Sequence, residues 1–185
     1  SEAFAAKHRA LGSSLLMGAS VAEFAGEDGR LTGLRLRDGR FFASDLALVG
    51  VGVLPEDALA REAGLAVENG VVVDDHLRAS DPAISAIGDS AFFPNPFGAG
   101  RIRLESVQNA VDQARCVARR IAGRPEPYRA TPWFWSDQAD YKLQTAGLPI
   151  GVEDYVTRGD VASGRFSSFG LKAGRVVVVE SINRP

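Results

Sequence analysis

The sequence predicts an α/β domain followed by a smaller domain rich in strands. Three observations predict this fold. The run "DLALVGVG", Asp45–Gly52, is almost continuously apolar, which is typical of a strand buried on both faces of a parallel sheet. Apolar residues recur at helical spacing across Glu105–Ala122. Beyond Tyr128 the pattern changes to alternating runs separated by turn residues, which favours an antiparallel or a small α+β domain.

The first fifty residues predict a short helix and an antiparallel meander. Ser1–Leu11 has a polar, helical pattern, and Gly12 follows it as glycine often follows a helix end. Glu27-Asp28-Gly29 and Asp38-Gly39 are hairpin signals between alternating apolar residues. The strand at Asp45–Gly52 comes directly after this meander.

The middle of the chain predicts two helices and two short strands. A short helix starts at Pro55, a residue suited to a first turn, and strands follow at Val71–Val73 and Ile84–Ile87. The clearest helix begins after a cap at Ser106 and ends before Gly123. We expect its apolar stripe to form one face, made of Val107, Ala110, Val111, Ala114, Val117, Ala118 and Ile121.

Composition excludes several classes of function. A net charge of −2 gives no basic field for nucleic acid or for a membrane surface, and no apolar run approaches the ~20 residues of a membrane span. The start of the chain does not resemble a signal peptide, and we expect no membrane partner. From the use of a single cysteine we expect a cytoplasmic location. Cys116 is the single cysteine and is expected to pack, while His8 and His76 are expected to be structural or solvated. We therefore expect no metal site.

A carboxylate directly follows the apolar run "AISAIG". Gly88 allows the backbone to approach a ligand, and Asp89 is an acceptor-only group that suits two vicinal hydroxyls of a ribose or ribityl chain. Ligands in open α/β sheets bind outside the carboxyl ends of strands, where this pair is predicted to lie. An Asx-turn or a locally satisfied helix cap would explain the same two residues.

Two further features suit a planar, electron-accepting ligand. The start of the helix at Glu105–Ala122 offers free backbone N–H groups and a partial positive charge, which suit the pyrimidine edge of a reduced flavin. A core helix without a ligand has the same pattern. Trp133 and Trp135 share one face of a predicted strand, where they would cover a cofactor, form an interface patch or fill the core of the tail domain.

Several segments carry a resemblance to a known family. "RLESVQNAVDQARCVARRIAGR", "PWFWSDQ" and "GRVVVVESINRP", in this order, resemble the FAD-dependent ferredoxin reductases of bacterial oxygenase systems, of the putidaredoxin, rhodocoxin and biphenyl dioxygenase reductase type. The stretch from "LVGVGVLPEDALAREAGL" to "AISAIGDS" resembles the second half of the FAD domain in two-dinucleotide-binding flavoprotein reductases. The resemblance covers essentially the whole chain.

The resemblance implies electron transfer from NAD(P)H through FAD to a [2Fe–2S] ferredoxin, with the flavin carrying the chemistry and no covalent catalytic residue. The Gly-Asp pair would contact the ribityl chain, the helix start would lie beside the flavin pyrimidine, and one tryptophan would face the flavin near the docked iron–sulfur partner. The residues so assigned are Gly88, Asp89, Glu105, Ser106, Val107 and Trp135.

The sequence departs from this family because no GxGxxG motif follows a strand, although the family has one for FAD and another for NAD. We therefore expect a fragment. Residues 1–50 would be the end of an NAD-binding domain, 51–127 the second half of an FAD-binding domain, and 128–185 a truncated reductase C-terminal domain. Missing segments would leave an apolar face uncovered, through which a homo-oligomer could form. Whether the chain alone holds FAD, and whether the parent protein uses NADH or NADPH, stays open at this point.

Two other functions fit the same residues. One is a cofactor-free interaction or assembly module that keeps the fold, and the other is a related flavoprotein reductase with a different electron acceptor. A chain that retains flavin supports either reductase, whereas a colourless chain that binds another protein tightly supports the module.

Overall fold

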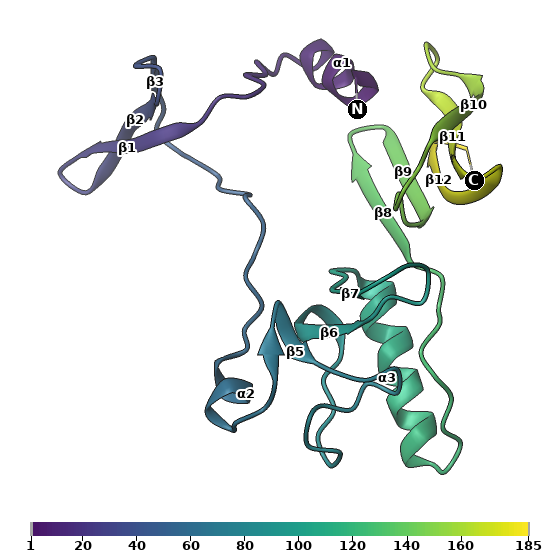
Figure 1. The fold of residues 1–185 in the computed structure, drawn as a ribbon. Coiled ribbons are helices and arrows are strands. Elements are labelled where there is room, and N and C mark those ends of the chain that lie inside the picture. The colour runs from purple at the N-terminus through teal and green to yellow at the C-terminus, as the bar shows by residue number, and fades with distance from the viewer. Residues whose placement is uncertain (1, 185) are drawn as a thin grey trace. The chain divides into compact units, whose positions relative to one another are not determined.

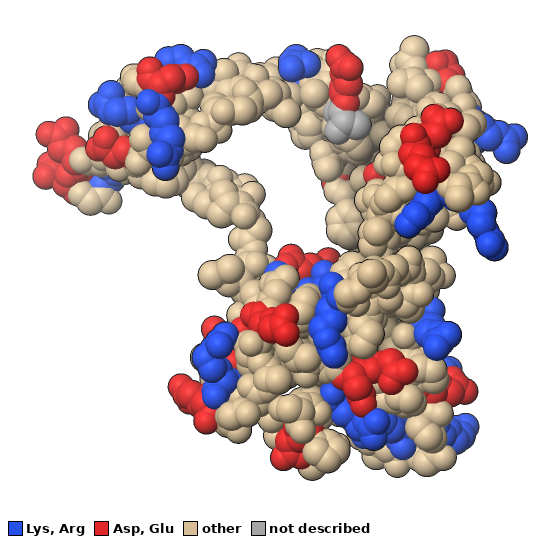
Figure 2. Space-filling model, in the orientation of Figure 1, with Lys and Arg blue, Asp and Glu red and all other residues tan. Residues whose placement is uncertain are grey.

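A computed structural model describes residues 2–184 of the chain. The chain divides into two compact units, Ser1–Val53 and Leu54–Pro185, each described here by itself. Figure 1 gives the order of the elements along the chain. Among the described residues, no helix combines the length and the apolar character needed to cross a membrane. Figure 2 shows acidic and basic side chains interspersed on the visible face, in keeping with the small net charge.

The first unit contains one helix and a three-stranded antiparallel sheet, as predicted. Its elements are α1 (Glu2–Ala10), β1 (Val21–Glu27), β2 (Arg30–Leu36) and β3 (Phe41–Ala43), with the strands in that order in the sheet. Asp28 and Gly29 have φ values of 49° and 75°, the left-handed pair that a two-residue hairpin turn requires. At the second turn, the Arg40 guanidinium hydrogen-bonds to Asp38 and holds the pKa of that carboxyl below its usual value.

The prediction of a buried strand at Asp45–Gly52 is wrong for this chain. The segment forms no strand, and Leu46, Leu48 and Val51 are 84%, 97% and 88% exposed. A strand buried on both faces needs neighbouring strands and a covering layer on each side. None of residues 2–184 pairs with this run, so its apolar side chains face solvent.

The second unit begins with a small sheet and one long helix. The sheet has the order β4-β5-β6-β7, with β5 and β6 parallel and the other neighbouring pairs antiparallel. The elements of this part are α2 (Ala58–Glu62), β4 (Val67–Glu68), β5 (Gly70–Val72), the 3₁₀ turn η1 (Gly88–Ser90), β6 (Ala91–Pro94), β7 (Arg101–Ile102) and α3 (Val107–Ile121).

Two predictions in this part need correction. The short helix begins at Ala58 rather than at Pro55, and residues 55–57 before it have no regular secondary structure. The strand predicted at Ile84–Ile87 is absent and is replaced by a single bridge between Arg78 and Ser85. The Asp81 side chain accepts a hydrogen bond from the Ala83 backbone N–H, which favours a turn over an extended strand at this point.

Helix α3 buries a different face from the one predicted, although two residues of the predicted stripe also pack inward, Val117 against the core and Ala110 against Gly88. Its buried residues are Asn109, Gln113 and Cys116, whereas Val107 and Ile121 are 63% and 77% exposed. At about 100° per residue, much of the predicted apolar stripe lies on the far side of the helix from these three residues. The hydrophobic core against which the helix packs includes Cys116 from the helix itself. The other buried members are Val71, Val73, Leu77, Ala91, Phe93 and Tyr128.

Cys116 packs in this core, as expected. Its thiol donates a hydrogen bond to the Glu126 backbone carbonyl over 3.3 Å. Burial raises the pKa of the thiol, so the neutral form that packing favours is retained. Cys116 is therefore built into the core as a small apolar residue.

The tail is an antiparallel sheet, one of the two forms predicted for it. Its five strands have the order β10-β11-β12-β9-β8, and the turn at Ala173-Gly174 is the predicted hairpin, with φ values of 48° and 73°. Gly147 has φ +88°, and a Cβ there would lie 2.1 Å from the Val177 carbonyl oxygen. The strands are β8 (Trp133–Gln138), β9 (Tyr141–Gly147), β10 (Asp154–Asp160), β11 (Arg165–Lys172) and β12 (Arg175–Ile182).

Candidate functional site

The predicted Gly-Asp pair forms a tight turn that contacts helix α3. Gly88 is buried at φ +68°, a conformation that favours glycine, and a Cβ there would lie 3.4 Å from the Ala110 Cβ. The Gly88 backbone N–H donates a hydrogen bond of 2.7 Å to the Gln113 side-chain oxygen. This bond joins residues 25 positions apart in sequence and ties the turn to the helix.

Asp89 is exposed. The prediction that its carboxylate lies at the end of a buried strand is therefore wrong. Its carboxylate accepts no hydrogen bond from any group among residues 2–184, so neither an Asx-turn nor a helix cap satisfies it. Its backbone carbonyl oxygen is held by the Arg103 guanidinium at 3.2 Å. The backbone at Asp89 is therefore anchored while its side chain stays available.

Arg103 is a site residue that the sequence analysis did not identify. Its side chain is only 11% exposed. Besides the Asp89 carbonyl, it hydrogen-bonds to the Glu105 carboxylate at 2.5 Å and to the Asn69 side chain at 3.3 Å. The alternation of basic and apolar residues in "RIRL" could have indicated this residue, since it places Arg101 and Arg103 on the same side of a strand.

The start of helix α3 lies next to this turn. Ser106 has the extended backbone of an N-cap, and its hydroxyl accepts a hydrogen bond from the Asn109 backbone N–H over 3.1 Å. The backbone N–H groups of Val107 and Gln108 make no hydrogen bond within the described part of the chain. Two free donors and the positive end of the helix dipole therefore meet at this point.

Two buried amide side chains, Asn109 and Gln113, lie within the first two turns of helix α3. Asn109 is fully buried, donates to the Leu104 carbonyl over 3.0 Å and accepts from the Tyr128 hydroxyl over 3.0 Å. Burial raises the pKa of Tyr128 to about 12, which keeps this donor protonated. Gln113 is also fully buried, and its Nε2 group has no partner among the described residues.

The aromatic pair lies on β8, beside the same helix. The Trp133 backbone N–H donates to the Gln108 side-chain oxygen over 3.0 Å, and the Trp133 and Trp135 rings stack with centroids 5.2 Å apart. Trp135 is 40% exposed. Between the helix start and β8 lies a cavity of about 220 Å³, whose lining includes Leu104, Glu105, Ser106, Pro132, Trp133, Phe134 and Thr145.

The structure therefore brings most of the predicted site residues together. The turn at Gly88 and Asp89 contacts helix α3 through Gln113 and is also bound by Arg103, which precedes the helix. Glu105 and Ser106 share a cavity with Trp133. Trp135 is stacked on Trp133 but does not line that cavity.

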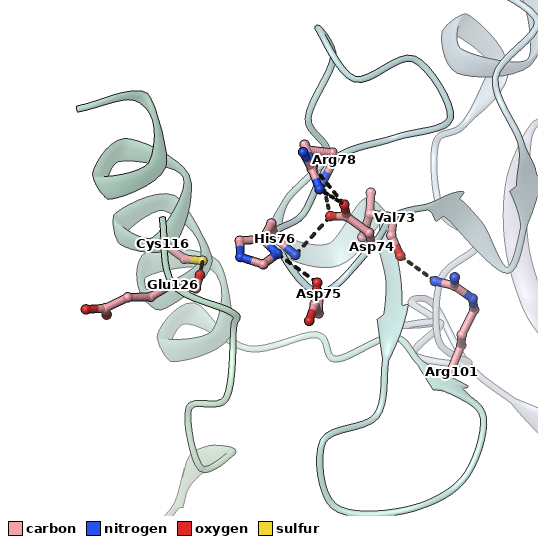
Figure 3. A network of polar contacts seen from close by, with 8 residues as sticks. All are labelled: Val73, Asp74, Asp75, His76, Arg78, Arg101, Cys116 and Glu126. Carbon is pink, nitrogen blue, oxygen red and sulfur yellow. Dashed lines mark hydrogen bonds and ion pairs between the residues drawn. The ribbon is translucent and has the colours of Figure 1, made fainter. Parts of the chain in front are cut away.

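A second polar cluster follows β5 and is drawn in Figure 3. The Asp74 carboxylate accepts hydrogen bonds from the Arg78 backbone and side chain and from the His76 backbone N–H. Burial alone would raise the pKa of Asp74, but these hydrogen bonds outweigh it and lower the pKa. The side chains of Asp74, Asp75 and His76 lie close enough to share a metal ion. Because Arg78 already engages both Asp74 oxygens, we interpret the cluster as a clamp on this loop.

Two family models match the chain. The model described as pyridine nucleotide-disulphide oxidoreductase matches residues 1–114, and the model described as reductase C-terminal matches residues 133–185. The chain is also 47% identical over 182 residues to rhodocoxin reductase of Rhodococcus erythropolis, covering 98% of this chain and 43% of that protein.

Solved structures match the same fold. A ferredoxin reductase for the CYP199A2 system from Rhodopseudomonas palustris has a TM-score of 0.96 and 49% identity, covering 100% of this chain and 46% of its own. The covalent complex of putidaredoxin reductase and putidaredoxin has a TM-score of 0.93 and 36% identity, with coverage of 98% and 44%. The chain thus spans less than half the length of these relatives.

The resemblance drawn from the sequence is confirmed by these matches, and so is the fold class of a partial FAD/NAD(P)-binding domain followed by a reductase C-terminal domain. The first family model alone matches more than half of the 185 residues. The chain belongs to the pyridine nucleotide-disulphide oxidoreductase family.

Proposed function

We propose that this chain forms part of an FAD-dependent reductase that passes electrons from NAD(P)H through FAD to a [2Fe–2S] ferredoxin. Its matched relatives include a rhodocoxin reductase and a ferredoxin reductase, which supports this proposal. FAD supplies the redox chemistry when bound, since it accepts a hydride and releases single electrons. The chain supplies position and electrostatics.

The observation that carries the proposal is the free Asp89 carboxylate on an anchored backbone. A carboxylate accepts hydrogen bonds only, and the vicinal hydroxyls of a ribityl chain are donors that match it. Gly88, at φ +68° and with no Cβ, lets the turn pack against Ala110 of α3 and so places Asp89 close to this helix. We assign Gly88 and Asp89 to the ribityl side of the FAD site.

The start of α3 is proposed to face the pyrimidine edge of the flavin. Glu105, Ser106 and Val107 form this start, where the free N–H groups and the helix dipole favour the negative charge that a flavin gains on reduction. Arg103 neutralises Glu105 through its 2.5 Å contact, so the carboxylate does not cancel this field.

Trp135 is proposed to face the flavin ring, with Trp133 stacked behind it. A half-exposed, stacked indole is a rigid planar surface that suits contact with a planar ring. The match to a reductase–putidaredoxin complex supports a small iron–sulfur protein as the partner.

The domain limits follow from the same proposal. Residues 1–50 would end an NAD-binding domain, residues 51–127 would form the second half of an FAD-binding domain, and residues 128–185 a reductase C-terminal domain. The exposed apolar side chains of Leu46, Leu48 and Val51 support contact with further protein surface, either of the parent protein or of a second copy. We further propose a cytoplasmic location, in line with the single cysteine.

The test is retention of FAD by the 185-residue chain. The chain is mixed with FAD, free flavin is removed, and the visible spectrum is recorded for wild type, Asp89→Ala and Glu180→Ala. Glu180 is an exposed carboxylate on β12 and serves as the matched control. We expect retained absorbance in wild type and in Glu180→Ala and much less in Asp89→Ala.

A wild-type chain without flavin absorbance would show that these residues do not hold FAD without the rest of the parent protein, and a colourless chain that binds another protein tightly would favour a cofactor-free interaction module. Flavin retained equally in all three proteins would refute the assignment of Asp89. Reduction of the flavin-loaded parent by NADH and by NADPH, followed by transfer to a [2Fe–2S] protein, separates a ferredoxin reductase from a reductase with another acceptor.

A further inference from the structure

We propose that Gln113 is a positioning residue that fixes the direction of the Asp89 carboxylate. The inference rests on the proposed function, because it concerns the ligand site that Asp89 forms. Gln113 lies two turns inside helix α3, has no exposed surface and makes one hydrogen bond, from the Gly88 backbone N–H at 2.7 Å. Gly88 is the residue immediately before Asp89.

The turn is held on both sides of Asp89. Gln113 fixes the backbone N–H that precedes it, and Arg103 fixes the backbone carbonyl of Asp89 itself. Between these two anchors, Gly88 adopts the left-handed conformation that starts the three-residue turn η1. A short turn whose backbone is anchored on both sides of the Gly88–Asp89 peptide group has little freedom to rotate, so the Asp89 side chain is presented in one direction.

The side-chain amide nitrogen of Gln113 shows that packing alone does not explain why a glutamine occupies this position. Its Nε2 group is buried and has no partner among residues 2–184. A buried donor without an acceptor disfavours the folded state. Methionine has nearly the same length and would fill the same space without a polar atom. Among the described residues, the hydrogen bond from the Gly88 backbone N–H is the one interaction that the Gln113 amide makes and that a methionine would not make.

The test is FAD affinity in Gln113→Met, measured by titration of flavin fluorescence with the 185-residue chain. We expect affinity to fall about tenfold, the equivalent of one lost hydrogen bond. Ser181→Ala is the matched control, because it removes a hydrogen bond to the buried Ser167 in the tail sheet and leaves the bond to Gly88 in place. FAD affinity should be unchanged in this control.

A double variant separates positioning from general damage. If Gln113 acts through Asp89, then Gln113→Met should weaken FAD binding in wild type but cause no further loss in Asp89→Ala. Equal losses in both backgrounds would overturn the inference, and so would wild-type affinity in Gln113→Met.

A wild-type chain that binds no FAD would show that FAD binding needs segments of the parent protein outside these 185 residues, and the inference would then be tested by a ligand-free measurement. Hydrogen exchange of the Gly88 amide should then be faster in Gln113→Met than in wild type and in Ser181→Ala. An unchanged exchange rate at Gly88 would show that Gln113 does not hold the turn.

Discussion

The hydroxyl of Tyr128 offers a self-contained test of the buried polar core. Tyr128 is 7% exposed, its hydroxyl donates to the fully buried Asn109 oxygen over 3.0 Å, and its ring meets Phe93 edge to face at 5.4 Å. Tyr128→Phe keeps the ring contact and removes only the hydroxyl. The variant should lose about 1–3 kcal/mol of unfolding free energy, because Asn109 is left with an unpaired buried acceptor.

The same residue makes this loss depend on pH. Burial raises the pKa of Tyr128 from 10.0 in the unfolded chain to about 12. A group whose pKa is raised by folding contributes stability that is complete below the unfolded pKa and is lost as pH rises toward the folded pKa. The Tyr128 contribution should therefore be constant below pH 10 and decline between pH 10 and 12. The decline amounts to about 3 kcal/mol, since one pKa unit is worth about 1.4 kcal/mol.

Urea unfolding of wild type and Tyr128→Phe at matched pH values measures both effects, since the other tyrosines and lysines titrate equally in the two proteins. The difference in unfolding free energy should be largest at pH 8 and should shrink or change sign above pH 11. A difference that stays constant from pH 8 to 11.5, or a variant as stable as wild type at pH 8, would refute the reasoning.

Two further substitutions test other parts of the fold. Ser106→Ala removes the N-cap of α3 and should lower stability by about 1 kcal/mol in urea unfolding, whereas Ser106→Thr should be close to wild type. A loss of stability in Ser106→Thr as large as that in Ser106→Ala would contradict this account. Gly147→Ala places a Cβ against the Val177 carbonyl at φ +88° and should lower the thermal midpoint of the tail sheet, while Gly174→Ala, where a Cβ meets no atom within 4 Å, should cost less. Equal effects at the two glycines would rule out the steric explanation.

Features that depend on a few neighbouring residues could be predicted from the sequence. The hairpin turns at Asp28-Gly29 and Ala173-Gly174 have left-handed backbone conformations, and the glycine in each turn, together with Asp28 in the first, signals this directly. The cap at Ser106 is equally local, because a hydroxyl and a backbone N–H three residues later suffice to form it. The shared face of Trp133 and Trp135 follows from strand geometry alone.

Features that depend on distant partners could not be predicted in this way. The apolar run at Asp45–Gly52 has the composition of a buried strand, but composition does not say whether the neighbouring strands belong to the same chain. Periodicity shows that α3 has an apolar side, yet this chain buries the side with Asn109 and Gln113 instead. The anchoring of the Gly88 turn by Gln113 and Arg103 bridges wide gaps in sequence, so no local pattern signals it.

The stacked indoles on β8 also give the protein an optical property. Trp133 and Trp135 are the only tryptophans in the chain, and their ring centroids lie 5.2 Å apart with an interplanar angle of 25°. Two chromophores this close couple excitonically, and the coupling gives a circular dichroism couplet that neither indole produces alone. Because Gln108 ties the Trp133 backbone to α3, the couplet reports on the order of β8 beside this helix. The chain thus carries its own intrinsic spectroscopic probe at the edge of the proposed flavin site.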